Sequence, residues 1–270
     1  MCKSSTLTAI RWSFAICYLS FAICLAACVP SEDALDRVRE TGVLRVGMDA
    51  SFPPFEFISA DGTVAGFDVD LARDLGAALG AGEEVEVQFI ANLPYDGLYD
   101  ALALGQVDVV ISALVINPAR MADFAYVSYF DAGQVLIVRS GEAGVGAMSD
   151  LGGRALAVEF GTRGDQEARK WARRVLDLNV VPHQTAAEAI AALKAGEVDA
   201  ALVDHVSALA EGVTGGGLAI VGEAVVSEPY AVAVRKDDRR LLRAIDEALA
   251  ELEADGTMDA LVAKWLRGDR

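Results

Sequence analysis

Charged, hydroxyl and aromatic side chains gather at four places in this 270-residue chain, and each place directly follows a predicted strand. The four groups are Asp49 with Phe52, residues 112–120, residues 159–164, and Asp204. Strands that alternate with helices form parallel sheets, whose ligands bind beyond the carboxyl ends of the strands. Polar groups placed in this way predict a small-molecule site, of the kind common in a cleft between two lobes.

The residue types disfavour several other kinds of site. His183 and His205 are the only histidines, and no cysteine is near them, so a zinc site is not supported. Ser112 and Ser207 lack a plausible histidine–acid set nearby in sequence, and the glycines at 215–217 lack the lysine and hydroxyl residue of a phosphate loop. We therefore expect no metal, no cofactor and no catalytic triad.

The hydrophobic pattern predicts two successive α/β units. For the first unit it predicts a strand at 42–47, a helix capped by Asp68, a strand at 85–90, a helix at 95–104 and a strand at 107–111. For the second it predicts a strand at 154–158, a helix through Trp171 to Leu176, a helix from a Thr185–Glu188 capping box to Gly196, and a strand at 198–203. Two further helices follow, separated by a turn at Asp255–Gly256. The segments 104–108 and 195–199 share a helix end, a glycine and a Val-Asp strand start, which indicates two lobes of similar design.

The charge balance limits the kinds of partner. The chain has 23 basic and 40 acidic residues and a net charge of −17. Binding to nucleic acid or to an anionic membrane surface requires basic patches, so neither is expected. About 240 residues remain beyond the amino-terminal leader, which is enough for two lobes.

The amino terminus has the pattern of a secretory signal peptide. Lys3 and Arg11 precede a largely apolar stretch that is shorter than the roughly 20 residues a membrane-spanning helix needs. The segment Leu25-Ala26-Ala27-Cys28 resembles the bacterial lipobox, which implies cleavage before Cys28 and lipid attachment to it. The alternative is an uncleaved anchor, and either one places the remainder outside the cytoplasm. The other cysteines lie in the leader, so no disulfide is expected in the folded part.

A series of motifs, in a fixed order, resembles one bacterial family. The motifs are Gly42-Val43-Leu44-Arg45-Val46-Gly47, Phe52-Pro53-Pro54-Phe55, Gly66-Phe67-Asp68-Val69-Asp70-Leu71, Tyr95-Asp96-Gly97-Leu98, Val107-Asp108-Val109-Val110-Ile111-Ser112, Arg120, Phe160-Gly161-Thr162, Gly196-Glu197-Val198-Asp199-Ala200, Asp204, Asp255-Gly256 and Lys264-Trp265. From Gly42 to Leu266 the chain resembles the extracellular solute-binding proteins of family 3, which bind polar amino acids for ABC importers.

The resemblance implies a two-lobed α/β fold of the periplasmic binding protein type II. Each lobe would be a mostly parallel sheet flanked by helices, and two strands would form the hinge. The expected division is a signal peptide at 1–27, a lipidated linker at 28–42, a first lobe at 43–131 and 230–270, and a second lobe at 132–229.

The resemblance also implies roles for individual residues. Arg120 matches the arginine that pairs with the ligand α-carboxylate, for which a guanidinium offers two parallel donors. Asp204 matches the acid that receives the ligand ammonium, although an aspartate after a strand is often a helix N-cap, and the two roles are compatible. Without the resemblance, Arg120 reads as a surface arginine.

Further contacts follow from the same match. Phe52 and Tyr95 match the aromatic pair that encloses the ligand side chain, with ordinary core packing as the alternative. Ser112 and Thr162 match polar contacts to the ligand.

The chain also departs from the family pattern. Val115 stands where a hydroxyl residue is usual, and Ala113 replaces a common small polar residue. Glu159 and Arg163 bring charges that either select a ligand side chain or are solvated. Asp49 matches an acid that cation-binding relatives direct at the far end of the ligand.

These observations predict a monomeric binding protein without enzymatic activity. It would deliver an amino acid, polar or cationic rather than acidic, to the permease subunits of an ABC importer. It would contact the membrane only through its lipid, in the periplasm or on the outer face of the cytoplasmic membrane. Two alternatives remain open: a periplasmic dehydratase acting on cyclohexadienyl acids such as prephenate and arogenate, and a ligand-sensing module for a membrane partner.

Overall fold

A computed structural model describes residues 33–213 and 217–267 of the chain. Its strands are β1 (Val43–Gly47), β2 (Ser51–Phe52), β3 (Glu56–Ile58), β4 (Val64–Ala65), β5 (Glu86–Ile90), β6 (Val109–Val110), β7 (Phe124–Asp131), β8 (Gln134–Arg139), β9 (Ala155–Glu159), β10 (Asn179–His183), β11 (Ala200–Asp204), β12 (Leu218–Val226) and β13 (Pro229–Arg235). Its α-helices are α2 (Ala34–Thr41), α3 (Phe67–Leu79), α4 (Leu98–Ala103), α5 (Arg163–Trp171), α6 (Ala186–Ala195), α7 (His205–Ala210), α8 (Arg239–Ala254) and α9 (Thr257–Trp265). Short 3-10 turns lie at η1 (Tyr95–Gly97), η2 (Pro118–Arg120) and η3 (Met148–Asp150).

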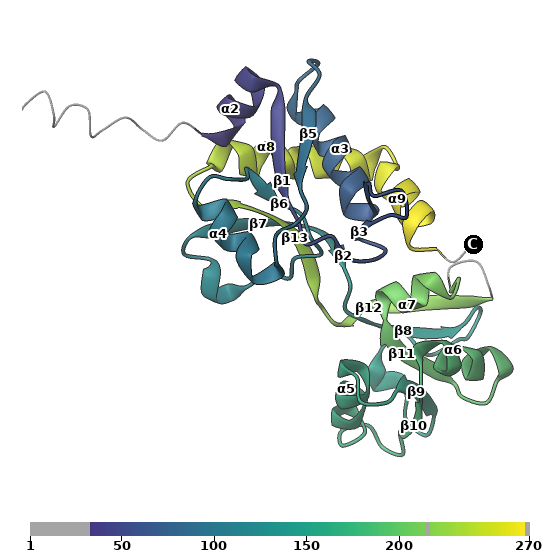
Figure 1. Ribbon diagram of the computed structural model, residues 1–270. Helices are drawn as coiled ribbons and strands as arrows, with labels where there is room; N and C mark the ends of the chain where they lie inside the picture. Colours follow the sequence, from purple (N-terminus) through teal and green to yellow (C-terminus); the bar gives the residue numbers. More distant parts are fainter. Residues whose placement is uncertain (1–32, 214–216, 268–270) are drawn as a thin grey trace, which may run out of the picture. The chain divides into compact units, whose positions relative to one another are not determined.

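The strands form two five-stranded sheets, with a small third sheet of β2, β3 and β4 beside the first (Figure 1). The first has the order β5-β1-β6-β13-β7, and the second has the order β10-β9-β11-β8-β12. In the first sheet β1 pairs in parallel with β5 and β6, whereas β13 runs antiparallel to β6 and β7. The second sheet has the same plan, with β9 parallel to β10 and β11 and β8 antiparallel to β11 and β12. The expected α/β, two-lobed fold class is therefore confirmed, and each sheet combines three parallel strands with an antiparallel pair.

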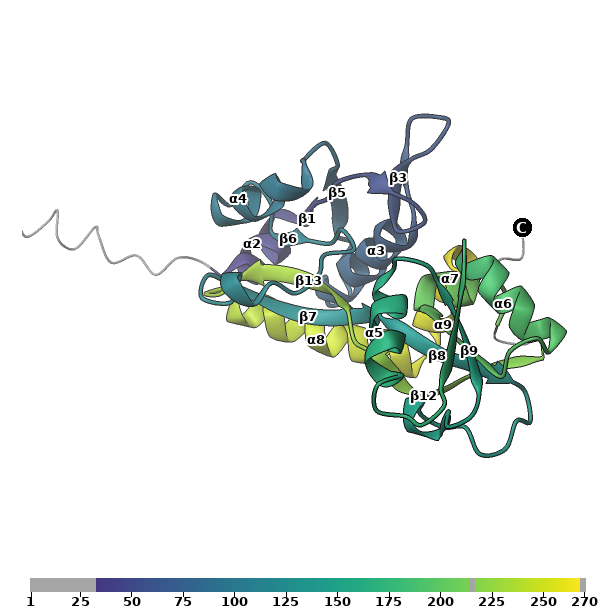
Figure 2. The same ribbon diagram turned by 90° about the horizontal axis from the view of Figure 1, so that it is seen from below.

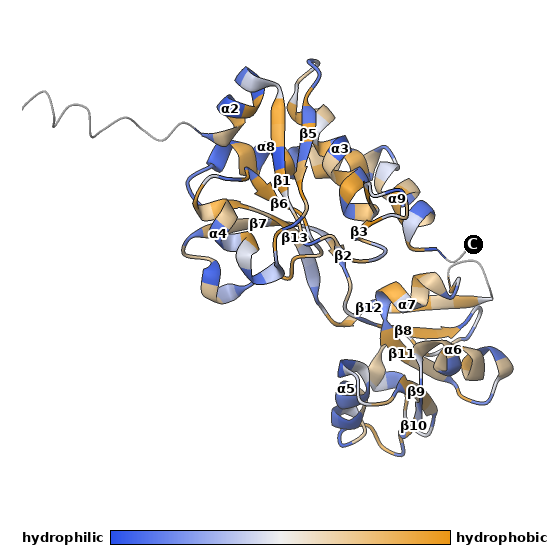
Figure 3. Ribbon diagram, in the orientation of Figure 1, coloured by the Kyte–Doolittle hydropathy of each residue, from blue (hydrophilic) through white to orange (hydrophobic). Residues whose placement is uncertain are grey.

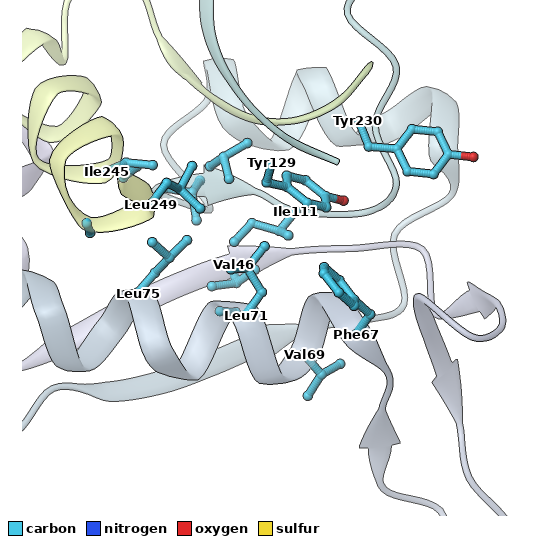
Figure 4. Close-up of a cluster of buried hydrophobic side chains, with 14 of the residues drawn as sticks. Val46, Phe67, Val69, Leu71, Leu75, Ile111, Tyr129, Tyr230, Ile245 and Leu249 are labelled. Atoms are coloured by element: carbon cyan, nitrogen blue, oxygen red, sulfur yellow. The ribbon is translucent and has the colours of Figure 1, made fainter. Parts of the chain in front are cut away.

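The first sheet is covered by helices on both faces because its strands are apolar on both sides. On β6 and the residue that follows it, Val109 and Ile111 join a cluster with α3, α8 and α9, while Val110 joins a second cluster with α4. Figure 4 shows the first cluster, in which Leu75 of α3 and Ile245 of α8 lie near the strands. Successive strand residues point to opposite faces, so a continuous apolar run fills both layers.

The second sheet follows the same rule with different helices. Leu136 and Leu202 pack with α5, whereas Ile137 and Ala201 pack with α6 and α7. Figure 3 shows the strands of both sheets as largely apolar and α5 as largely polar. Figure 2 gives the same elements from below, with α8 running along β7.

Two segments carry the chain between the sheets. β7 leads into β8 through Ala132 and Gly133, and β12 leads into β13 through Ser227 and Glu228. The segments are bonded to each other, since the Ala132 N–H donates to the Glu228 carbonyl at 3.1 Å.

The two sheets repeat one local arrangement. Asp108 accepts a 2.8 Å hydrogen bond from the Arg45 N–H of β1, and Asp199 accepts a 2.8 Å bond from the Ala155 N–H of β9. In each sheet, an arginine on the adjacent antiparallel strand donates to two carbonyls, one near the end of a helix and one just before the strand that follows that helix. Arg235 donates to the carbonyls of Leu102 and Val107, as Arg139 does to those of Leu193 and Val198. The sequence similarity between 104–108 and 195–199 therefore corresponds to a shared structural unit.

Two sequence predictions of local structure are wrong. Asp68 does not cap α3, which begins after Gly66; its carboxylate instead turns into the core and accepts from the Ala113 N–H and the Tyr129 hydroxyl. The helix expected through 171–176 ends at Trp171. The N–H groups of Arg173 and Arg174 bond three residues back, and Asp177 takes a φ of 55°. Local periodicity does not report either tertiary contacts or the tightening of a last turn.

The predicted ends of α6 are confirmed, but the reciprocal bond of the expected capping box goes to the residue before Thr185. The Thr185 side chain accepts from the Glu188 N–H, while the Glu188 carboxylate accepts from the Gln184 N–H, and α6 ends at Gly196 in the left-handed conformation. The signal peptide, Cys28 and most of the glycine run at 215–217 lie outside the described residues. Within the described part, no helix is both long enough and apolar enough to cross a membrane.

Candidate functional site

A pocket of about 320 Å³ lies at the carboxyl ends of β1 and β6. Residues that follow these strands line it together with the β2–β3 hairpin, η1 and the start of β13. They are Asp49, Ser51, Phe52, Glu56, Tyr95, Ser112, Ala113, Val115 and Tyr230. We call this hollow the first-lobe pocket. Five of the residues proposed from sequence meet here, namely Asp49, Phe52, Tyr95, Ser112 and Ala113.

Asp49 and Tyr95 are joined across the rim of the pocket. The Tyr95 N–H donates to the Asp49 carboxylate at 3.2 Å, and the Tyr95 hydroxyl accepts from the Val115 N–H at 3.4 Å. Phe52 stacks on Phe55 with ring centroids 6.0 Å apart. Phe52 and Tyr95 are nonetheless 48% and 43% exposed, although large aromatic residues usually lie in the interior. Their free faces are available to enclose a ligand.

Ser112 lies at the floor of the pocket and is hydrogen-bonded to two residues of the protein. It is 1% exposed, accepts from the Asp49 N–H at 2.9 Å, and donates to Glu56 Oε1 at 2.9 Å. Its hydroxyl proton therefore points at Glu56. The backbone turns sharply at Ala113, whose φ is 40°, and its N–H donates to Asp68 at 2.6 Å.

Glu56 and Asp68 form a buried pair of acids beneath this floor. Burial raises the pKa of the Glu56 carboxyl far above its usual range, and the neighbouring Asp68 raises it further. Burial also raises the pKa of Asp68, but hydrogen bonds from Ala113 N–H and from the Tyr129 hydroxyl oppose that rise. Glu56 is therefore the member of the pair that holds a proton at neutral pH.

A second hollow, of about 330 Å³, lies where the connecting segments meet the second sheet. Its lining includes Arg163, Asp204 and Gln134 from the second lobe and shares Phe52 and Tyr230 with the first-lobe pocket. Arg163 forms an ion pair with Glu228. Asp204 caps α7 by accepting from the Ser207 N–H at 2.8 Å, so the N-cap role considered from sequence is present.

Three predicted site residues, Arg120, Glu159 and Thr162, line neither hollow. Arg120, at the end of η2, is exposed and lies over the Tyr99 ring with its guanidinium carbon 5.3 Å from the ring centroid. In the described part of the chain it forms no ion pair. Thr162 caps α5 through the Asp165 N–H and donates to the Glu159 carbonyl at 2.7 Å.

The sequence pattern of the bacterial extracellular solute-binding proteins, family 3, matches residues 44–268. The chain belongs to this family. It is 33% identical over 242 residues to the L-cystine-binding protein TcyJ of Escherichia coli strain K12, which covers 88% of each chain. It is 28% identical to the histidine-binding periplasmic protein of Salmonella typhimurium, over 84% of this chain and 88% of the relative.

Solved structures of similar proteins include both binders and an enzyme. An ancestral cationic amino acid solute-binding protein is 32% identical, with a TM-score of 0.59 over 87% of this chain and all of that one. An ancestral cyclohexadienyl dehydratase is 25% identical, with a TM-score of 0.71 over 87% of this chain and 97% of that one.

Sequence reasoning about this family 3 protein missed three pocket residues, Ser51, Glu56 and Tyr230. Glu56 lies in a short strand after two prolines, where an acid reads as a solvated edge residue. Its burial accompanies the packing of the Phe55 ring, tilted or edge-on, against Phe67, Phe130 and Tyr230, which holds β3 under the pocket. The described residues contain no cluster of histidine, cysteine or acidic side chains suited to a metal ion.

Proposed function

We propose that this chain is the extracytoplasmic substrate-binding component of an ABC importer and that it binds a polar or cationic amino acid. The observation that carries the proposal is the lining of the first-lobe pocket. It combines two exposed aromatic rings with the carboxyl groups of Asp49 and Glu56, and its nine lining residues include no basic side chain. Family membership, and the amino-acid-binding relatives, support the same function.

The pocket's charge favours the ligand class. The Asp49 carboxylate at the rim attracts a cationic or amide end group, and aromatic faces also attract cations. An acidic ligand side chain would meet like charge there. Arg163, which would favour an acidic ligand, is instead paired with Glu228 in the second hollow.

The head group of the ligand would be held by both lobes. In this proposal the first lobe comprises 43–131 and 230–270, and the second comprises 132–229. Arg120 would pair with the α-carboxylate and Asp204 with the α-ammonium, with Thr162, Ser112 and the Glu159–Arg163 segment adding contacts. A ligand that touches both lobes favours the closed state only through such differential contacts. Closure about the two connecting segments would bring Asp204 and Arg163 of the second lobe to the first-lobe pocket, which lies on the same lobe as Arg120.

A thermal-shift screen of the twenty amino acids and ornithine tests the proposal. A ligand at 100 times its dissociation constant stabilises the folded protein by about 2.7 kcal/mol. We expect clear shifts with arginine, lysine, ornithine, histidine or glutamine. A shift with glutamate or aspartate alone would overturn the ligand class, and no shift with any amino acid would count against the function.

The leader sequence and the family support a proposal for the location, membrane anchoring and partners of the protein. We propose export to the periplasm or to the outer face of the cytoplasmic membrane, anchoring through lipid on Cys28, a monomeric state, and docking to the permease subunits of an importer. The periplasmic location of the named histidine-binding relative supports export.

One observation favours a second candidate, a dehydratase. The ancestral cyclohexadienyl dehydratase has a similar fold, and dehydration requires a proton donor at the leaving hydroxyl. Glu56 is a protonated acid in the first-lobe pocket, but its Oε1 is engaged by Ser112. Incubation of the purified protein with prephenate and with arogenate decides between the two. Product formed by the wild type and lost in Glu56→Gln would establish the enzyme.

A further inference from the structure

Glu56 presents an unexplained polar atom at the base of the first-lobe pocket. The residue is 1% exposed, and Oε1 accepts from Ser112. Oε2 is buried and has no hydrogen-bond donor within the described part of the chain. A buried carboxylate oxygen without a donor is costly, so a charged Glu56 is a poor fit to this environment.

Asp68 supplies the missing partner if Glu56 carries a proton. Each of the two carboxyl groups affects the pKa of the other, that of Glu56 being raised by Asp68. Asp68 already accepts from the Ala113 N–H and the Tyr129 hydroxyl, so its charged form is the better stabilised. A proton on Glu56 Oε2, donated to Asp68, satisfies both side chains and leaves one negative charge on the pair.

Every element packed around Glu56 contributes neutral or acidic groups. The titratable groups that interact with it are Asp49 after β1, Asp68 on α3, Tyr95 on η1, Tyr129 on β7 and Tyr230 on β13. None of these groups is basic, and no described residue that lines the first-lobe pocket is basic. The pair therefore lacks a counterion of its own.

We propose that a cationic group of the ligand supplies that counterion, and that its binding in the first-lobe pocket releases the proton of Glu56. The inference rests on the proposed function and identifies Glu56 as a residue that selects cationic ligands. The O–H bond of Glu56 breaks, the proton passes to water or buffer, and the pair then carries two negative charges. The ligand cation, placed between Asp49 at the rim and Glu56 at the floor, offsets the added charge. An opposite charge within about 4–6 Å favours the ionised form of an acid.

The consequence is a binding affinity that depends on pH and on ligand charge. Because a proton leaves on binding, affinity for a cationic amino acid increases as pH rises from 6 to 8.5. A neutral amino acid such as glutamine releases no proton from this pair, so it lacks that increase.

Isothermal titration calorimetry with arginine tests the proposal. Titrations at pH 8 in phosphate and in Tris differ in enthalpy by the number of protons exchanged times the difference in buffer ionisation enthalpy. We expect the wild type to release more protons than Glu56→Gln, a variant that keeps the side-chain shape and can still donate to Asp68 and accept from Ser112. Protons exchanged by the ligand amino group appear in both proteins and cancel. Glu86→Gln, an exposed acid on β5, should match the wild type.

An infrared difference spectrum provides a second readout that does not depend on affinity. The carbonyl stretch of a protonated carboxylic acid should be present in the free wild type at neutral pH, absent in Glu56→Gln, and weakened by arginine. If arginine, lysine and ornithine bind with equal proton exchange in the wild type and in Glu56→Gln, the proton-release proposal is wrong while the binding function stands. If no amino acid binds at all, the proposed function fails first.

Discussion

The Asp131 carboxylate accepts a 2.8 Å hydrogen bond from the N–H of Glu228, a residue 97 positions later in the chain. Asp131 ends β7 and Glu228 precedes β13, so the bond joins the two segments that pass between the sheets. The same carboxylate accepts from the Gly133 N–H at 2.8 Å and from the Ser227 hydroxyl at 2.7 Å. These hydrogen bonds lower the pKa of Asp131 even though its partial burial acts in the opposite direction. The Asp131 side chain therefore joins the two connecting segments, about which closure of the lobes is proposed.

Removing the Asp131 carboxylate should weaken the contact between the two segments that pass between the sheets. Asp131→Ala leaves the N–H groups of Gly133 and Glu228 without their acceptor, at a cost of roughly 1–3 kcal/mol in the free energy of unfolding. Asp131→Asn should cost less because its amide oxygen can still accept. Urea unfolding of the two variants measures this. Equal stability of Asp131→Ala and the wild type would contradict the role given to the carboxylate.

Gly133 should tolerate no side chain. A Cβ there would lie 1.9 Å from the Val226 carbonyl and 2.8 Å from the Asp131 carboxylate, so the second segment would have to move. We expect Gly133→Ala to lower the free energy of unfolding by about 1–3 kcal/mol. Gly152→Ala is a matched control, because its Cβ would come no closer than 3.6 Å to the Leu176 carbonyl. Thermal unfolding of both variants tests the difference, and a similar loss in both would point to a general glycine effect.

Glu56 should make the stability of the protein fall as pH rises. Its pKa in the folded state is above that in the unfolded state, so folding takes up a proton once the unfolded glutamate ionises, near pH 4.3. The unfolded state then binds fewer protons than the folded one, and stability declines from about pH 5 through neutral pH. Glu56→Gln has no proton to take up, so its advantage over the wild type should grow with pH. Denaturant titrations at pH 5, 7 and 8.5 measure this, and a constant difference would show that Glu56 is ionised in the fold.

Substitution of Asp204 or of Arg120 should weaken ligand binding. Asp204→Asn keeps a good N-cap for α7 but removes the charge proposed to receive the ligand ammonium. We expect it to bind at least a hundredfold more weakly, about 3 kcal/mol, while its melting temperature without ligand stays near that of the wild type. Arg120→Ala should weaken binding by a similar amount, and Arg120→Lys should recover only part of it.

Calorimetry on these variants checks both assignments. Wild-type affinity in Asp204→Asn would reduce Asp204 to a helix cap. Wild-type affinity in Arg120→Ala would leave its stacking on Tyr99 as the residue's role.

Cys28 should determine where the exported protein is found. Cys28→Ser removes the thiol that the lipobox pattern presents for acylation, so the variant should incorporate no labelled palmitate and should leave the membrane fraction or remain unprocessed. Labelling of wild type and variant in parallel measures this. Equal labelling would exclude lipid attachment at this residue.

Much of the secondary structure could be predicted from the sequence, because the buried face of a helix or strand places apolar residues at regular spacings. The apolar run at 107–111 predicts a strand covered on both faces, and Val109, Val110 and Ile111 do divide between two clusters. Thr185 and Gly196 mark the ends of α6 through capping, which depends only on neighbouring backbone groups. The placement of site residues after strands likewise follows from how parallel strands end. That rule located Asp49 and Ser112 at the first-lobe pocket.

Only the tertiary structure decided which polar groups are buried next to each other. Glu56 and Asp68 lie on β3 and α3, and no periodicity relates an acid in a two-proline hairpin to an acid in the first turn of a helix. Their pairing arises when aromatic packing around Phe55 buries the hairpin and Tyr129 reaches Asp68 from β7. The protonation state of an acid depends on desolvation and on charges within a few ångströms, and both are set by residues far away in sequence. Periodicity records which face of an element is buried, but it carries no information on what that face meets.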